Sequence, residues 1–136
     1  MDKITEHIWI GNSEEAKDRE SLQAAGIRSM LCLDGCMTRV GAEKIGVERV
    51  EVVELIDGAG NRPEVFVRAV RLLRELTEKH SPVLVHCYAG RSRSAAVVCN
   101  FFMREQGDSL TEAMRRITCK RKVAIAAGLQ DLLDLK

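Results

Sequence analysis

The chain has 136 residues, of which 46% are hydrophobic and 30% charged, and 21 basic against 20 acidic side chains leave a formal net charge of +1. This size and composition suit one buried core, so we expect one globular domain over residues 1–136. The balanced charge excludes the strongly basic class of nucleic-acid-binding proteins, and no apolar run is long enough to predict a membrane span or a signal peptide.

The first half of the chain alternates between strand-like and helix-like segments. Gly11, Asn12 and Ser13 predict a turn and a helix cap, and Gly26 predicts the end of the helix that follows. A loop with several small residues is expected at 57–61. We expect a helix at 14–25 and strands at 3–10, 27–33 and 50–56.

The second half predicts a helix that starts near Pro63, because proline is tolerated in a first turn. The apolar side of this helix is expected to contain Phe66, Ala69, Val70, Leu73 and Leu76. A short apolar run at 82–86 predicts a buried strand at the centre of a sheet. Further helices are expected at 92–105, 110–118 and 126–135. Alternating strands and helices predict an α/β sandwich.

The segment that follows the predicted central strand reads HCYAGRSRSAA. Ligands of open α/β sheets gather at the carboxyl ends of strands, so a site is expected here. A tight loop between strand and helix turns backbone N–H groups inward, and their field adds to the positive end of the helix. We therefore expect phosphate to bind to the loop residues Tyr88, Ala89, Gly90, Arg91, Ser92 and Arg93.

Four residues of this segment have individual chemical roles. Cys87 lies at the strand exit, where amides and a nearby cation lower a thiol pKa and favour the nucleophilic thiolate. Arg93 offers a planar fork that pairs with two phosphoryl oxygens. Gly90 allows the positive φ that converging amides require. Ser94 can donate a hydrogen bond to the sulfur when it departs as a thiolate.

Attack on phosphorus also needs an acid that protonates the departing oxygen, placed on a neighbouring loop at the same edge of the sheet. Asp57 follows a predicted strand and precedes glycines that would let a lid move. It could also be an ordinary turn residue. Glu54 and Asp34 are the alternative candidates.

The chain resembles a known family at this point, the cysteine-based protein tyrosine phosphatases. Their signature His-Cys-x5-Arg-Ser/Thr matches residues 86–94, and Ala-Gly-x-Ser-Arg-Ser at 89–94 is typical of the dual-specificity branch. The likeness also includes the N-terminal segment ITEHIWIGN…LQAAGIRSMLCL. It implies a three-layer fold with a central mixed, largely parallel sheet flanked by helices. It also implies hydrolysis of phosphorylated proteins or peptides through a phosphocysteine, with Cys87, Arg93, Asp57 and Ser94 as catalytic residues.

Two details bear on how the loop is supported. His86 could end its strand as a buried ring, or it could orient the loop and tune the thiolate, and the resemblance favours the second role. The family often has Pro-Asn before its last helix, with the asparagine bracing the loop, whereas this chain has KVAIA at 122–126. The bracing group must therefore be replaced by another or be absent. The basic run at 120–122 reads as a solvated helix end.

The five scattered cysteines predict reduced thiols and a cytoplasmic protein. Cys32 and Cys36 resemble half of a zinc site, but no second ligand pair follows at suitable spacing, so neither a metal nor another cofactor is expected. Cys32, Cys99 and Cys119 are interpreted as inert core residues. An alternative is that Cys32 pairs with Cys87 as a protective disulfide under oxidation.

Other functions remain open from the residues alone. The loop would bind anions in a non-enzymatic phosphate-binding module, and a sulfurtransferase also places its cysteine between strand and helix. Within the phosphatases, a phosphoinositide or an RNA 5′ end could replace the phosphoprotein. Residues 36–47 give little sign of an aromatic phosphotyrosine grip, so a shallow pocket that admits phosphoserine and phosphothreonine is expected in a monomer.

Overall fold

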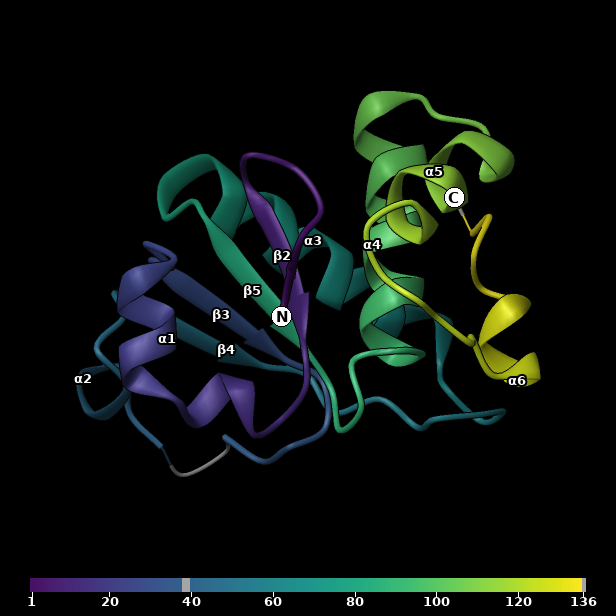
Figure 1. Ribbon diagram of the computed structural model, residues 1–136. Coiled ribbons are helices and arrows are strands. Elements are labelled where there is room, and N and C mark those ends of the chain that lie inside the picture. The colour runs from purple at the N-terminus through teal and green to yellow at the C-terminus, as the bar shows by residue number, and fades with distance from the viewer. Residues whose placement is uncertain (38–39, 136) are drawn as a thin grey trace.

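The protein forms a five-stranded sheet with the strand order β1-β2-β5-β3-β4, as its computed structural model shows for residues 1–37 and 40–135 (Figure 1). β1 is antiparallel to β2, and the other neighbouring strands are parallel. This confirms the mixed, largely parallel sheet and the central position of the strand that precedes Cys87. The strands are β1 Asp2–Lys3, β2 Ile8–Gly11, β3 Ser29–Cys32, β4 Arg49–Val52 and β5 Val83–His86.

Helices cover both faces of the sheet and make three layers (Figure 1). One face packs on the 3-10 turn η1 (Glu15–Lys17) and on the helices α1 (Arg19–Ala24) and α2 (Ala42–Ile45). The other face packs on α3 (Pro63–Lys79) and α4 (Arg93–Gln106), and α5 (Leu110–Thr118) and α6 (Ala127–Gln130) pack against α4.

The alternation of side chains along β5 divides the core into two apolar clusters. Leu84 faces the α1 layer, whereas Val83 and Val85 face α3 and α4. Because all four residues of β5 are buried, the site at its carboxyl end is anchored in the middle of the molecule.

Three helices of the second half, α3, α4 and α5, match their predictions. α3 begins at Pro63 and buries the five apolar residues expected of it. Gly107 ends α4 with a positive φ, and Ser109 with Glu112 forms a reciprocal capping box at the start of α5. Among the described residues, no helix is both long and apolar enough to cross a membrane.

Several predicted elements are shorter or broken. The strand expected at 3–10 is a hairpin, in which Asp2 pairs with Ile10 and the backbone turns at 4–7. The helix expected at 14–25 is interrupted at Asp18, because this side chain accepts a hydrogen bond from the Ser21 N–H and caps α1. The last helix is one short turn of helix, Ala127–Gln130.

The strand expected at 50–56 also ends early, at Val52. Its backbone nevertheless continues beside β3, because the N–H groups of Val53 and Leu55 donate to the carbonyls of Cys32 and Leu33. α2 was not predicted, since its four residues are too few to show a helical period.

Candidate active site

Cys87 directly follows the central strand, and the 87–92 loop leads from it into α4. Gly90 has φ +68°, and a Cβ at this position would lie 2.4 Å from the carbonyl oxygen of Gly11. Only glycine therefore fits where the loop meets the end of β2. The N–H of Ser13 also donates to the Tyr88 carbonyl at 3.1 Å, which ties the loop to the same strand end.

The Cys87 sulfur lies 3.4 Å from the Ser94 hydroxyl oxygen, at the start of α4, and the residue is only 2% exposed. Burial raises the pKa of the thiol. Hydrogen bonds from the Ser94 hydroxyl and from the backbone N–H groups of Ser94, Gly90 and Ser92 outweigh this effect and hold the pKa of Cys87 below its ordinary value. The converging amides expected of this loop are thus directed at the sulfur.

Arg93 places a half-buried guanidinium at the first turn of α4. Its Nη1 donates to the Leu55 carbonyl at 3.3 Å, and its buried Nε has no hydrogen-bond partner among the described residues. The Ser92 hydroxyl does not cap the helix, because it accepts a hydrogen bond from the Ala126 N–H at 2.9 Å. Donors of the guanidinium and of the uncapped helix end are therefore available to an anion.

Asp57 shares a pocket of about 240 Å³ with Cys87. Asp34, one of the alternative acids, instead accepts a hydrogen bond from the Cys36 N–H at 3.0 Å, and Glu54 packs against Gly35. Of the three acids considered, only Asp57 lines this pocket. The lining residues are Asp57, Cys87, Tyr88, Ala89, Arg91, Ser92, Arg93 and Ala124.

The side chain of Asn61 holds the loop that contains Asp57. Its Oδ1 accepts from the Ile56 N–H at 2.7 Å, and its Nδ2 donates to the carbonyls of Ile56 and Gly58 at 2.7 and 3.2 Å. Gly128 of α6 lies against the same loop, since a Cβ there would be 2.1 Å from the Ala59 nitrogen. The loop that contains Asp57, which was expected to be a movable lid, is therefore held by the hydrogen bonds of the Asn61 side chain and packs against α6.

Arg121 braces the 87–92 loop from outside. Its Nε donates to the Gly90 carbonyl at 2.7 Å, its Nη2 to the Ala89 carbonyl at 3.3 Å and its Nη1 to Asp2 Oδ2 at 2.9 Å. The interpretation of 120–122 as a solvated helix end is wrong for Arg121, whose side chain is only 13% exposed. The run gave no sign of this role, because the partners are carbonyls of a segment distant in the sequence.

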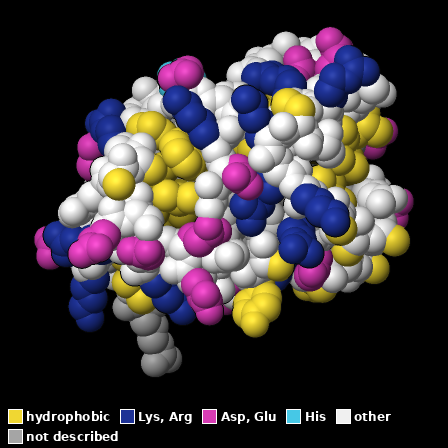
Figure 2. All heavy atoms as spheres, viewed as in Figure 1, with side chains coloured by type: hydrophobic (Ala, Val, Ile, Leu, Met, Phe, Trp, Pro, Cys, Tyr) yellow, Lys and Arg dark blue, Asp and Glu magenta, His cyan; other side chains and the backbone are white. Residues whose placement is uncertain are grey.

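The segment at 122–126, where the family's asparagine is missing, also contributes backbone support. The Ala124 N–H donates to the Arg91 carbonyl at 2.9 Å. Together with the hydrogen bond from the Ala126 N–H to Ser92, this contact fixes the second half of the loop. On the face shown in Figure 2, Lys and Arg side chains are interspersed with Asp and Glu side chains.

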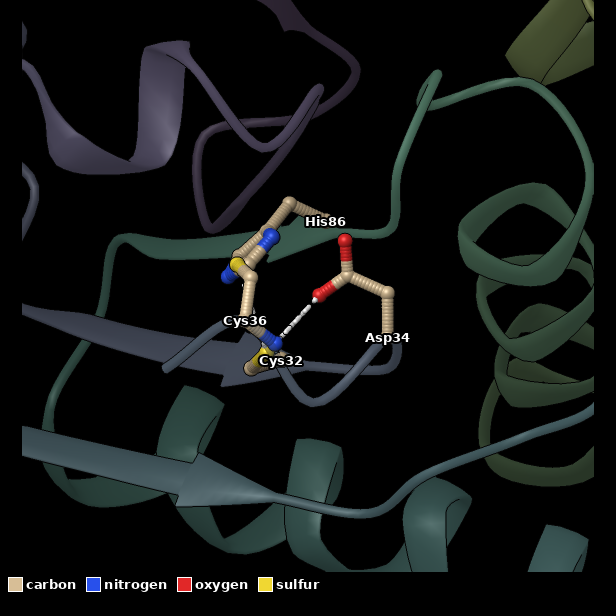
Figure 3. Close-up of side chains that lie close together, drawn as sticks. All are labelled: Cys32, Asp34, Cys36 and His86. Carbon is tan, nitrogen blue, oxygen red and sulfur yellow. Dashed lines mark hydrogen bonds between the residues drawn. The ribbon is translucent and has the colours of Figure 1, made fainter. Parts of the chain in front are cut away.

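His86 is fully buried, and neither ring nitrogen has a hydrogen-bond partner among the described residues. Burial lowers the pKa of His86 to about 4, so the ring is neutral near pH 7 and provides no positive charge for the thiolate. Three side chains lie next to His86 (Figure 3). Cys32 is at the end of the adjacent strand β3, and Asp34 and Cys36 follow that strand. The sequence-based search for metal ligands missed this group, because it looked for a second pair along the chain and His86 comes from an adjacent strand.

The structure argues against a disulfide between Cys32 and Cys87. Cys32 belongs to the apolar cluster on the α1 side of the sheet, whereas Cys87 belongs to the cluster on the α3 side. Cys32 is paired in register with His86, and its sulfur lies 3.9 Å from that of Cys36. All five cysteines are free thiols, and Cys119 is exposed rather than part of the core.

The sequence and the structure of the chain are similar to those of known proteins. The dual specificity phosphatase catalytic domain family matches residues 8–132. Dual specificity phosphatase 28 of Mus musculus is 30% identical over 122 residues, which are 90% of this chain and 74% of the relative. Dual specificity protein phosphatase 1 of Arabidopsis thaliana is 26% identical over 135 residues, which are 98% of this chain and 67% of the relative. The crystal structure of human DUSP28 superposes with a TM-score of 0.84 at 23% identity, covering 98% of this chain and 92% of that one.

Proposed function

The chain belongs to the dual specificity phosphatase family, and from this premise we propose that it hydrolyses phosphorylated proteins through a phosphocysteine on Cys87. One observation carries the proposal. Cys87, Asp57 and Arg93 line the same pocket, at the carboxyl end of the central strand. A nucleophile, an acid and an anion-binding fork are the groups that such a reaction needs.

The first step forms the phosphoenzyme. The Cys87 thiolate attacks phosphorus, a sulfur–phosphorus bond forms, and the bond from phosphorus to the leaving oxygen breaks. Asp57 gives its proton to that oxygen, so the alcohol or phenol leaves neutral. The Arg93 guanidinium and the loop amides bind the phosphoryl oxygens and stabilise the charge that they carry in the transition state.

The second step releases phosphate. Asp57, now a carboxylate, takes a proton from water while the water oxygen attacks phosphorus, and the sulfur–phosphorus bond breaks. The electron pair of that bond returns to Cys87 as a thiolate. The Ser94 hydroxyl, 3.4 Å from the sulfur, donates a hydrogen bond to the departing anion.

We propose that the pocket accepts more than one kind of phosphorylated side chain. Tyr88 is 74% exposed, and among the described residues only Asp57 and Ala124 line the pocket from outside the 87–93 segment. A pocket formed by so few side chains is shallow enough for phosphoserine and phosphothreonine as well as phosphotyrosine. Free cysteines suit a reducing compartment, so we place the reaction in the cytoplasm.

A substrate panel tests the proposal. Wild type and Cys87→Ser are compared on p-nitrophenyl phosphate, on phosphotyrosine, phosphoserine and phosphothreonine peptides, and on a phosphoinositide and a 5′-triphosphorylated RNA. We expect wild type to hydrolyse phosphopeptides with the highest kcat/KM and Cys87→Ser to be inactive. Binding of phosphate without any turnover, or a clear preference for the lipid or the RNA, contradicts it.

A further inference from the structure

Four potential metal ligands, Cys32, Asp34, Cys36 and His86, lie close together (Figure 3). Cys32 belongs to the apolar cluster on the α1 side of the sheet, whereas Cys87 belongs to the cluster on the α3 side. Cys32 ends β3, Asp34 and Cys36 come from the segment that follows it, and His86 ends β5. One ligand atom from each residue lies within 4.8 Å of every other. The register pairing of Cys32 with His86 brings the two strands' contributions together.

We propose that Cys32, Asp34, Cys36 and His86 bind one Zn²⁺ ion. Two thiols, an imidazole and a carboxylate form a four-ligand set of the types that zinc prefers. In a tetrahedral site with Zn–S bonds of about 2.3 Å, two sulfurs lie about 3.8 Å apart. The sulfurs of Cys32 and Cys36 are 3.9 Å apart, which is already this spacing.

The His86 ring gives independent support for a ligand at this place. A fully buried imidazole whose two nitrogens have no hydrogen-bond partner among the described residues is costly, because burial removes its contacts with water without replacing them. Coordination of one ring nitrogen to zinc would satisfy that atom. Asp34 and Cys36 are only half-buried, so an ion can reach the cluster from solvent.

Zinc binding would deprotonate both thiols. Each thiol loses its proton when its sulfur bonds to zinc, so binding releases two protons to the buffer for each ion. The two thiolates and the Asp34 carboxylate carry three negative charges against the two positive charges of the ion. His86 coordinates as the neutral ring and releases no proton.

The site lies apart from the phosphate pocket. None of the four ligands lines the pocket that contains Cys87, and Cys32 belongs to the opposite apolar cluster. A bound ion would join the segment after β3 to the last residue of β5. It would thereby fix the strand end from which the 87–92 loop departs.

The test uses the full chain with the Cys87→Ser substitution, because the nucleophile is itself a metal-binding thiol. The protein is kept reduced, freed of metal with a chelator and titrated with Co²⁺, then with Zn²⁺ as competitor. We expect one ion per chain, visible ligand-field bands of tetrahedral intensity, a sulfur-to-cobalt charge-transfer band and two protons released per Zn²⁺. Zinc should also raise the unfolding temperature.

Matched substitutions locate the site. Cys36→Ser should weaken Co²⁺ binding more than about tenfold and reduce the charge-transfer band, because one thiolate is lost. His86→Gln should weaken it similarly, and Asp34→Asn provides a milder change if the buried His86→Gln variant does not fold. Cys119→Ser removes an exposed thiol outside the cluster and should leave binding unchanged.

Three results would overturn the zinc site. The first is the absence of a sulfur-to-cobalt charge-transfer band in the reduced protein, and the second is Co²⁺ binding that Cys36→Ser leaves unchanged. The third is a Cys32–Cys36 disulfide that, once reduced, gives two thiols that bind no metal. Because the nucleophile is replaced throughout, none of these results depends on whether the protein is a phosphatase.

Discussion

Arg121 donates from Nε to the carbonyl oxygen of Gly90 at 2.7 Å, across the backbone of the 87–92 loop. Gly90 is also the residue whose missing side chain lets the loop approach Gly11. The guanidinium therefore holds the loop at the residue that approaches the end of β2. We infer that Arg121 fills the bracing role that an asparagine has in much of the family.

Replacement of Arg121 by lysine should misplace the loop. A lysine keeps the charge but cannot span the carbonyls of Ala89 and Gly90 and the Asp2 carboxylate at once. Loss of a hydrogen bond to a charged group costs about 1.5–3 kcal/mol, so kcat/KM should fall roughly ten- to a hundredfold. Steady-state kinetics with p-nitrophenyl phosphate measure this. Lys122→Ala, at the exposed neighbour, is the control, and equal rates in both variants would argue against a bracing role.

Gly128→Ala should displace Asp57 and leave Cys87 in place. The added Cβ would lie 2.1 Å from the Ala59 nitrogen and must push the loop that contains Asp57 away from α6. We expect kcat to fall about tenfold or more while the affinity for inorganic phosphate stays within twofold, since a misplaced acid slows proton transfer and not anion binding. Gly41→Ala is the matched control, because a Cβ there meets no atom of the described, non-adjacent residues within 4 Å. Wild-type kcat in Gly128→Ala would show that the contact does not position Asp57.

Ser94→Ala should raise the pKa of Cys87, because the hydroxyl is one of the donors that lower it. The thiolate exists above the pKa, so the pH midpoint of Cys87 alkylation by iodoacetamide should move upward. Breakdown of the phosphoenzyme should slow more than its formation, since the sulfur leaves as an anion only in the second step. Ser109→Ala, at the cap of α5, is the control. Equal slowing of both steps, with an unmoved midpoint, would reject the role of Ser94.

Asp57→Asn should slow the hydrolysis of substrates with poor leaving groups more than that of substrates with good ones. The amide cannot donate the acidic proton, so hydrolysis of a phosphotyrosine or phosphoserine peptide should slow about a hundredfold or more. p-Nitrophenolate leaves without help, and the first step with its phosphate should slow much less. Single-turnover measurements on both substrates check this. A phosphotyrosine rate equal to wild type would assign the acid to another residue.

Much of the fold was predictable because its second half consists of long periodic segments. α3 shows a complete apolar face from Phe66 to Leu76, and β5 is a short apolar run between a helix and a glycine-containing loop. Errors fall where one side chain overrides the local pattern, as Asp18 does when it caps α1 in the middle of a predicted helix. They also fall where a segment is too short to show a period, as in α2.

The residues of the candidate site also differ in how far the sequence could predict them. The segment from Cys87 to Ser94 could be proposed as a site because a single continuous stretch contains the candidate nucleophile, the amides and the guanidinium. Asp57 could be proposed from its place after a strand, and the structure brings it into the same pocket. Arg121, Gly128 and the partners of His86 could not be predicted, since each acts through contacts between segments far apart in the chain.

The most direct test of the account is rapid acid quenching of wild type during turnover of p-nitrophenyl phosphate, followed by mass spectrometry of the peptides. We predict a phosphoryl group on Cys87 that accumulates within the first turnover and is absent from Cys87→Ser. Steady turnover with no phosphorylated cysteine, or with the phosphoryl group on another residue, would contradict the proposed mechanism.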